Sequence, residues 1–252
     1  MDFNINNLTE DEKFALLYGI MLGDGCISKY KSGGRKYIIF SISGDYYSDR
    51  SFYLKVLCPL IDSIRKNKKP IKIKERLGQG KLEIQFSDKE LVTKFTKLGF
   101  PLGKKGTKLK IPKWFFQKNL VKQIIQGLFA TDGSLVLTKN PNKYYPRLEV
   151  HLIAPKVINQ TNKFLISKNI AGKVYECKRN KIDPRFKIVQ KKFRVQINGK
   201  ENLLLFNKKI GFANPKHKEK FLNFLRYSKE YDKNILGIPC NKHNFIRNKV
   251  KL

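Results

Sequence analysis

The sequence predicts an α+β fold that is duplicated about a pseudo-twofold axis, with the order αββαββα in each half and two antiparallel sheets around a paired-helix interface. Three sequence patterns each occur twice, in the same order along the chain, which predicts the duplication. An apolar helical stretch ending in Asp-Gly occupies residues 17–25 and recurs at residues 125–133. A strand pattern and a Gly-Phe pair recur as well, at residues 81–86 and 99–100, then at 192–197 and 211–212.

The first half is expected to comprise residues 1–112. Thr9 followed by Glu12 has the pattern of a capping box, so a helix should begin there and end near Gly25. In the second of two strand pairs, apolar residues alternate with basic and polar ones, which predicts one core face and one hydrogen-bonding face. The strand pairs are expected at residues 27–43 and 71–86, and further helices at residues 49–66 and 88–98.

The second half is expected to comprise residues 113–226, followed by a basic C-terminal tail at residues 227–252. Its first helix spans residues 114–131 with a break near Asn119, which is a suitable cap for the second segment. Its strands are expected at residues 134–138, 147–153, 173–178 and 192–197.

The chain is strongly basic, with 53 Lys and Arg against 20 Asp and Glu and a formal net charge of +33. Such an excess usually accompanies a polyanionic partner, and nucleic acid is favoured over an anionic membrane because no basic amphipathic helix dominates. A lysine-rich host composition explains part of the excess.

The cysteines and the apolar runs argue against zinc-binding, disulfide-rich, membrane-spanning and secreted proteins. The four cysteines form no Cys-x-x-Cys, which argues against zinc and disulfide frameworks and fits a reducing compartment. No apolar run reaches the roughly 18 residues of a membrane span, and no secretion signal is recognisable. An intracellular location is expected, in a mitochondrion, a chloroplast or a prokaryotic cytoplasm.

Small residues line one side of each apolar helix. They lie four apart, at Gly19 and Gly23 in the first copy and at Gly127 and Thr131 in the second. Glycine inside a helix costs about 0.5–1 kcal/mol relative to alanine, so a packing reason is expected. Small residues at this spacing let two helices approach almost backbone to backbone. Two parallel helices paired in this way would bring Asp24 and Asp132 together at one end.

That arrangement of carboxylates is unfavourable without a cation. A carboxylate at a helix C-terminus opposes the macrodipole by about 0.3–1 kcal/mol, and two close carboxylates repel each other. A divalent cation reverses both effects, and a site made only of oxygen ligands suits Mg²⁺, Mn²⁺ or Ca²⁺. One helix ending in Asp-Gly would be read as a plain C-cap turn, but two matching copies in so basic a chain favour a metal-dependent nuclease.

The two segments resemble the paired signature helices of the LAGLIDADG homing endonucleases, in the single-chain form with two motifs. The positions that match the signature are Gly19, Gly23, Asp24, Gly25, Gly127, Asp132 and Gly133. Leu22 and Ala130 stand where the signature has its first acidic residue, and Thr131 replaces a small residue. A glutamine common in the family is missing, with Gly44 and Ile153 near its place. The resemblance covers residues 9–225.

The resemblance implies a DNA-binding saddle. Each antiparallel sheet would lie in one of two successive major grooves of double-stranded DNA, and both strands would be cut between them to leave short 3′ overhangs. Asp24 and Asp132 would be the catalytic, metal-binding pair, with the backbone carbonyls of Gly23 and Thr131 as further ligands. Mg²⁺ would be the cofactor, Mn²⁺ would substitute for it, and Ca²⁺ would bind without supporting turnover.

Basic residues near the metal and polar residues on the strands complete this expectation. In the family a lysine often lies near each metal-bound phosphate, and Lys105 and Lys218 are the candidates here. The expected DNA-reading residues are Arg35, Tyr37, Ser41, Ser43, Lys72, Lys74, Arg76, Lys81, Glu83, Gln85, Ser134, Thr138, Arg147, Glu149, His151, Arg194, Gln196 and Asn198. The two halves differ at almost every such position, so a monomer recognising a long, non-palindromic site is expected.

Two rival functions fit the same composition. An intron RNA maturase or DNA-binding regulator with this fold would bind host intron RNA or DNA without cutting. A DNA-packaging protein would bind all sequences alike, with a steep dependence on salt.

Overall fold

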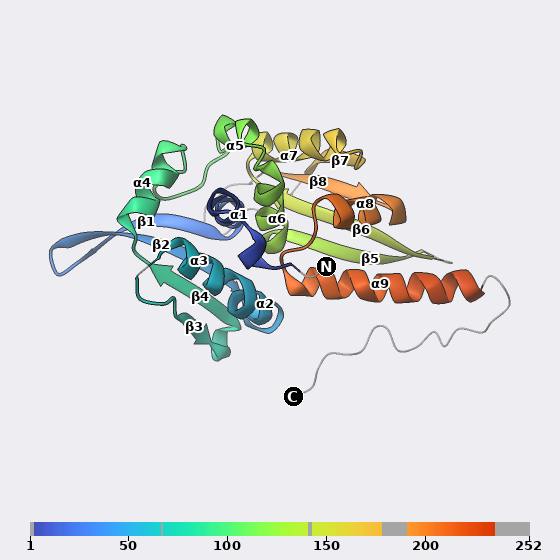
Figure 1. Ribbon diagram of the computed structural model, residues 1–252, viewed down its shortest axis with the longest axis horizontal. Helices are drawn as coiled ribbons and strands as arrows, with labels where there is room; N and C mark the ends of the chain where they lie inside the picture. The colour runs from blue at the N-terminus through green and yellow to red at the C-terminus, as the bar shows by residue number, and fades with distance from the viewer. Residues whose placement is uncertain (1–2, 67, 141–142, 178–190, 235–252) are drawn as a thin grey trace.

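The structure is a computed structural model that describes residues 3–66, 68–140, 143–177 and 191–234 (Figure 1). A short 3-10 turn, η1 (Ile5–Asn7), precedes the first half. The elements of that half are α1 (Glu10–Gly23), β1 (Gly25–Ser32), β2 (Arg35–Asp45), α2 (Tyr46–Phe52), η2 (Tyr53–Leu57), α3 (Cys58–Ile64), β3 (Ile73–Arg76), η3 (Leu77–Gln79), β4 (Lys81–Phe86) and α4 (Lys89–Lys97). Its antiparallel strands lie in the order β1-β2-β4-β3.

The second half repeats this arrangement. Its elements are α5 (Lys113–Gln117), α6 (Val121–Thr131), β5 (Gly133–Asn140), β6 (Lys143–Leu152), α7 (Pro155–Ser167), β7 (Gly172–Cys177), β8 (Lys192–Asn198), α8 (Lys200–Lys209) and α9 (Pro215–Asn234). The strand order β5-β6-β8-β7 matches that of the first sheet. The duplicated α+β architecture predicted from the sequence is therefore confirmed.

The helices α1 and α6 pack against each other at the centre of the molecule, with one sheet on each side (Figure 1). Their backbones touch where glycines replace larger residues. A Cβ atom placed on Gly19 would lie 2.1 Å from the carbonyl oxygen of Ile124, and one on Gly127 would lie 2.3 Å from that of Leu16. The glycine stripe is therefore the close-packing surface of this helix pair.

Each sheet has one covered face and one open face. In β4, Leu82 and Ile84 are buried, whereas their neighbours Lys81 and Gln85 point to the opposite side. The covered faces, both central helices and the outer helices contribute to one cluster of buried apolar residues that extends through both halves. The polar strand residues remain on the open faces.

Three details differ from the expectations. The helix expected at residues 49–66 contains a π-helical turn, η2, which separates α2 from α3. The break near Asn119 is present, but Asn119 adopts a left-handed conformation (φ 57°) and Leu120 is the N-cap of α6, without a side-chain hydrogen bond. The expected boundary at residue 226 falls inside α9, and the rest of the tail, residues 235–252, lies outside the described residues.

Among the described segments, no helix is long and apolar enough to cross a membrane.

Candidate active site

Asp24 and Asp132 occupy equivalent positions at the ends of the central helices. Each is the C-cap residue of its helix, with φ −84° and ψ −4° for Asp24 and φ −85° and ψ 0° for Asp132. The helices meet closely here, because a Cβ on Gly23 would lie 3.1 Å from Oδ2 of Asp132. Two carboxylates thus meet at the point where two helix C-termini direct their carbonyl groups.

The pKa values of both aspartates reflect this crowding. Burial and the charge of Asp132 raise the pKa of Asp24 to about 7, although Lys105 and Lys216 oppose the shift. Burial likewise raises the pKa of Asp132, again against Lys105. Part of Asp24 remains exposed to solvent, so a ligand can reach the pair. A divalent cation would keep both carboxylates ionised.

Lys105 reaches the same point from the loop after α4. Its ammonium group donates hydrogen bonds to the carbonyls of Met21 (3.1 Å), Leu22 (3.0 Å) and Gly23. Burial lowers the pKa of Lys105, while the two aspartates raise it. The carbonyl of Gly23, expected as a metal ligand, thus holds an ammonium group, which places a positive charge at the C-terminus of α1.

A second basic group belongs to a bridge between the halves that was not anticipated from the sequence. Asn214 donates hydrogen bonds to the carbonyl of Ala130 (2.8 Å) and to Asp49 (3.2 Å). Lys216 contacts the same Asp49 carboxylate at 2.5 Å, and its charge acts on Asp24. Lys218, the expected residue, instead places its Nζ 5.6 Å from the centre of the Phe221 ring. Lys216 is therefore the stronger candidate for the second basic residue.

The open face of the first sheet carries the residues expected to read DNA. Glu83 is only 6% exposed and pairs with Arg76 (3.4 Å) and Lys81 (3.3 Å). Lys74 donates a hydrogen bond to Gln85 (3.0 Å). The remaining expected residues of this half lie on β2 or just before β3: Arg35, Tyr37, Ser41, Ser43 and Lys72.

The second sheet has a corresponding cluster built around Glu149, which is 9% exposed. Its carboxylate lies 3.3 Å from Arg147, 3.6 Å from Arg194 and 3.3 Å from His151. Gln196 donates a hydrogen bond to Asn198 (2.8 Å) on the same face. Two other expected residues lie on β5, Ser134 and Thr138, of which the Thr138 side chain is outside the described part.

Comparison with known proteins identifies this arrangement. Residues 119–211 match the family described as LAGLIDADG-like domain. The homing endonuclease I-DmoI has the same fold, with a TM-score of 0.53, 16% identity and coverage of 81% of this chain and 91% of that one. The second half therefore contains a region similar to a LAGLIDADG-like domain, and the whole chain shares the fold of a homing endonuclease.

Two further solved structures share the fold of this chain. The LAGLIDADG meganuclease I-AabMI, bound to uncleaved DNA, has a TM-score of 0.53 and 16% identity, with coverage of 88% of this chain and 92% of that one. The meganuclease I-SmaMI, bound to uncleaveable DNA, has a TM-score of 0.54 and 14% identity, with coverage of 89% and 93%.

A curated relative is much longer. The replication factor C small subunit of Methanocaldococcus jannaschii is 25% identical over 190 residues, which are 73% of this chain and 9% of that protein. The chain thus spans less than a tenth of that relative's length.

The structure also shows which side chain lies beside Gly44, the position near which a glutamine was expected from the resemblance. At Gly44 a Cβ atom would lie 2.8 Å from the ring of Tyr53. Burial raises the pKa of Tyr53, and the charge of Asp24 adds to the effect. The phenol oxygen of Tyr53 is buried and has no hydrogen-bond partner among the described residues. The hydroxyl of Tyr53, from η2, therefore lies beside Gly44 and close enough to Asp24 to feel its charge.

Proposed function

We propose that this protein is a sequence-specific homing endonuclease that cuts both strands of a long, non-palindromic DNA site with the help of a divalent metal. The observation that carries the proposal is the meeting of Asp24 and Asp132 at two helix ends, flanked by two sheets with basic open faces. Solved proteins of the same fold are described in complex with DNA and Ca or Mn, which supports a divalent cation.

The donors at the helix ends fit a hard cation such as Mg²⁺. The carboxylates of Asp24 and Asp132 and the carbonyl of Thr131 are oxygen ligands, the kind that Mg²⁺ prefers, whereas the expected Gly23 carbonyl is held by Lys105. A bound divalent ion would activate a water and stabilise the leaving 3′ oxygen of the phosphodiester, which leaves 3′-hydroxyl and 5′-phosphate ends. Staggered cuts in the two strands would give the short 3′ overhangs. Mn²⁺ is expected to substitute for Mg²⁺, and Ca²⁺ to bind without turnover.

The protein residues around the aspartates position the DNA backbone. Lys105 and Lys216 approach the carboxylates from opposite halves, so each is placed to hold one phosphate against the pair. Tyr53 packs against Gly44 near Asp24 and leaves no room for a larger side chain at position 44.

The open sheet faces provide the sequence readout. Arg76 and Arg147 suit guanine edges, and Gln85 and Gln196 suit adenine edges. Because Glu83 lies on β4 of the first sheet whereas Glu149 lies on β6 of the second, the two halves present different patterns. A single chain with unlike halves recognises a non-palindromic site as a monomer.

A cleavage assay on the DNA that spans the insertion site of the gene tests the proposal. Purified protein should linearise a plasmid carrying that junction in Mg²⁺ or Mn²⁺, and should bind but not cut it in Ca²⁺ or EDTA. A plasmid with random sequence in place of the junction is the control. Tight binding of host intron RNA with no cutting in any metal would favour the maturase instead. Equal affinity for both plasmids would favour a packaging protein.

A further inference from the structure

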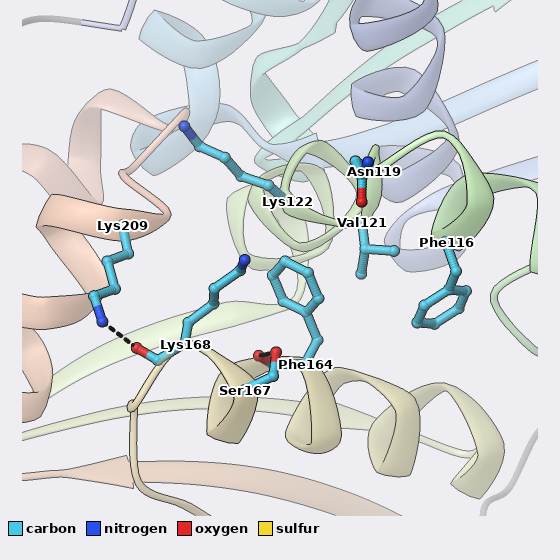
Figure 2. Close-up of a pocket in the computed structure, with 8 residues that line it drawn as sticks. All are labelled: Phe116, Asn119, Val121, Lys122, Phe164, Ser167, Lys168 and Lys209. Carbon is cyan, nitrogen blue, oxygen red and sulfur yellow. Dashed lines mark hydrogen bonds between the residues drawn. The ribbon is translucent and has the colours of Figure 1, made fainter.

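A cleft of about 560 Å³ lies in the second half, at the end of α6 remote from Asp132. Figure 2 shows its lining, which comes from α5, the start of α6, and the ends of α7 and α8. Because α6 rises about 1.5 Å per residue, its first residue lies roughly 16 Å from Asp132 along the axis. The cleft is therefore separate from the aspartate pair and lies on the side of the sheet that helices cover.

The chemistry of the lining is basic and aromatic. The residues are Phe116, Asn119, Val121, Lys122, Phe164, Ser167, Lys168 and Lys209, with no carboxylate among them. Phe116 is 39% exposed, and the ammonium group of Lys168 lies 5.3 Å from the centre of the Phe164 ring. In Figure 2 the side chain of Lys168 extends toward the Phe164 ring, whereas that of Lys122 points away from Lys168 and Phe116.

The charge around the cleft is unbalanced beyond the lining itself. The three segments that form it, residues 113–131, 155–171 and 200–210, contain lysines throughout but only one acidic residue, Glu201. Among the described residues, no ion pair joins a carboxylate to Lys122, Lys168 or Lys209. Within these three segments positive charges outnumber negative ones, while Glu12 of α1 lies beside the start of α6, where it accepts a hydrogen bond from Gln123 (2.6 Å).

The pseudo-twofold repeat provides a comparison within the chain. The start of α1 is satisfied by the capping box of Thr9 and Glu12 and has an acidic first turn, with Glu10 paired to Lys13. The start of α6 has no side-chain cap and no acidic residue in its first turn, and carries Lys122 instead. A cation at a helix N-terminus opposes the macrodipole. Lys168 and Lys209 lie at helix C-termini, where a positive charge is favourable. Lys122 lies at a helix N-terminus, where its charge is unfavourable, and a bound anion would offset that cost.

We propose that this cleft binds an unpaired stretch of nucleic acid, with phosphates on Lys122 and Lys168 and a base against Phe116. The volume lies within the range of about 300–1,000 Å³ that small-molecule sites occupy, which suits one nucleotide. Lysines beside exposed aromatic rings are the combination that holds single strands, since a duplex keeps its bases stacked inside. This site does not depend on the proposed endonuclease function.

Fluorescence anisotropy with labelled 12-nucleotide oligo(U) and oligo(dT) tests the proposal. The variant carries Lys122→Gln with Lys168→Gln. Its control carries Lys89→Gln with Lys97→Gln, which removes two exposed lysines from the two ends of α4. The first variant should bind both oligonucleotides about tenfold more weakly at physiological salt. The slope of log K against log salt should fall in magnitude by about 1.4, as expected for two lost phosphate contacts on a single strand.

A second variant and a second ligand separate the cleft from the sheet faces. Phe116→Ala, at an exposed ring, should weaken oligonucleotide binding at least about fivefold, the lower end of base stacking on an aromatic ring. Neither variant should change affinity for duplex DNA more than twofold. Tighter binding of oligo(U) than of oligo(dT) would identify RNA as the source of the strand, through its 2′-hydroxyls, and equal binding would assign the cleft to either nucleic acid.

Equal weakening by the two lysine pairs would overturn the proposal, because general charge would then account for binding. It would also be overturned if Arg147→Gln with Arg194→Gln abolished oligonucleotide binding while the cleft variants had no effect. Because duplex binding is measured on the same samples, failure of this site and failure of the endonuclease proposal give different results.

Discussion

Replacing Gly19 by alanine should separate the central helices and misplace the aspartates. The added Cβ would lie 2.1 Å from the carbonyl oxygen of Ile124 and 2.9 Å from its Cα, both backbone atoms that no rotamer change can move. Restoring an ordinary contact of at least 3.4 Å requires α1 and α6 to shift by more than an ångström.

The energetic effect has two opposing parts. Overpacking a close contact costs about 1–3 kcal/mol, and the backbone nature of this one favours the upper end. Alanine recovers about 0.5–1 kcal/mol as a better helix former than glycine. The free energy of unfolding should therefore fall by about 2 kcal/mol. Catalysis should suffer more, because displacing reacting groups by about 1 Å costs on the order of 10²-fold in rate.

Urea unfolding followed by circular dichroism measures the first effect, and single-turnover cleavage of the junction DNA measures the second. Gly78→Ala is the matched control, because its Cβ would meet nothing within 4 Å and Gly78 has no positive φ. That variant should stay within about 0.5 kcal/mol of the parent. If Gly19→Ala were as stable and as active as Gly78→Ala, the backbone contact between the helices would be refuted.

Two further predictions concern the charges around the aspartates. In metal-free protein, Asp24 stays protonated in the folded state up to about pH 7 but titrates near pH 4 when unfolded, so its contribution to stability falls as pH rises between these values. Asp24→Asn should remove this component, which the change in Tm between pH 5 and pH 8 in EDTA would reveal; an unchanged profile would contradict the raised pKa. Lys105→Met and Lys216→Met should each slow cleavage by about 10²-fold while duplex affinity changes little, as expected when one charged donor is lost at a reacting phosphate. Lys218→Met should have a smaller effect, and a larger one would exclude Lys216 as the second basic residue.

The repeated local patterns made much of the fold predictable. Small residues four apart and an Asp-Gly end define the central helix pair, because helical periodicity places them on one side. Strand alternation likewise identified both open faces, since a side chain that points away from a buried Leu82 or Val150 must point to the other side.

Contacts between distant segments were not predictable in the same way. Asn214 and Asp49 meet across the two halves, and neither position has a periodic signal that points to the other. Lys216 and Lys218 are separated by one residue in a lysine-rich stretch. Which of the two lysines faces the aspartates depends on the direction in which α9 begins, and the sequence does not reveal that direction. The π-helical turn at η2 is wider than a regular helical turn, so it changes the register of the residues that follow Tyr53 relative to the one that a regular helix would predict.

Asp24 and Asp132 are proposed to form one divalent-metal site that serves cleavage of both DNA strands. The most direct test is Asp132→Asn, assayed for cleavage of the junction DNA in Mg²⁺ and for affinity to the same duplex in Ca²⁺. The variant should bind the duplex as the parent does, whereas cleavage of both strands should be lost. Cleavage at the parent's rate would contradict the claim.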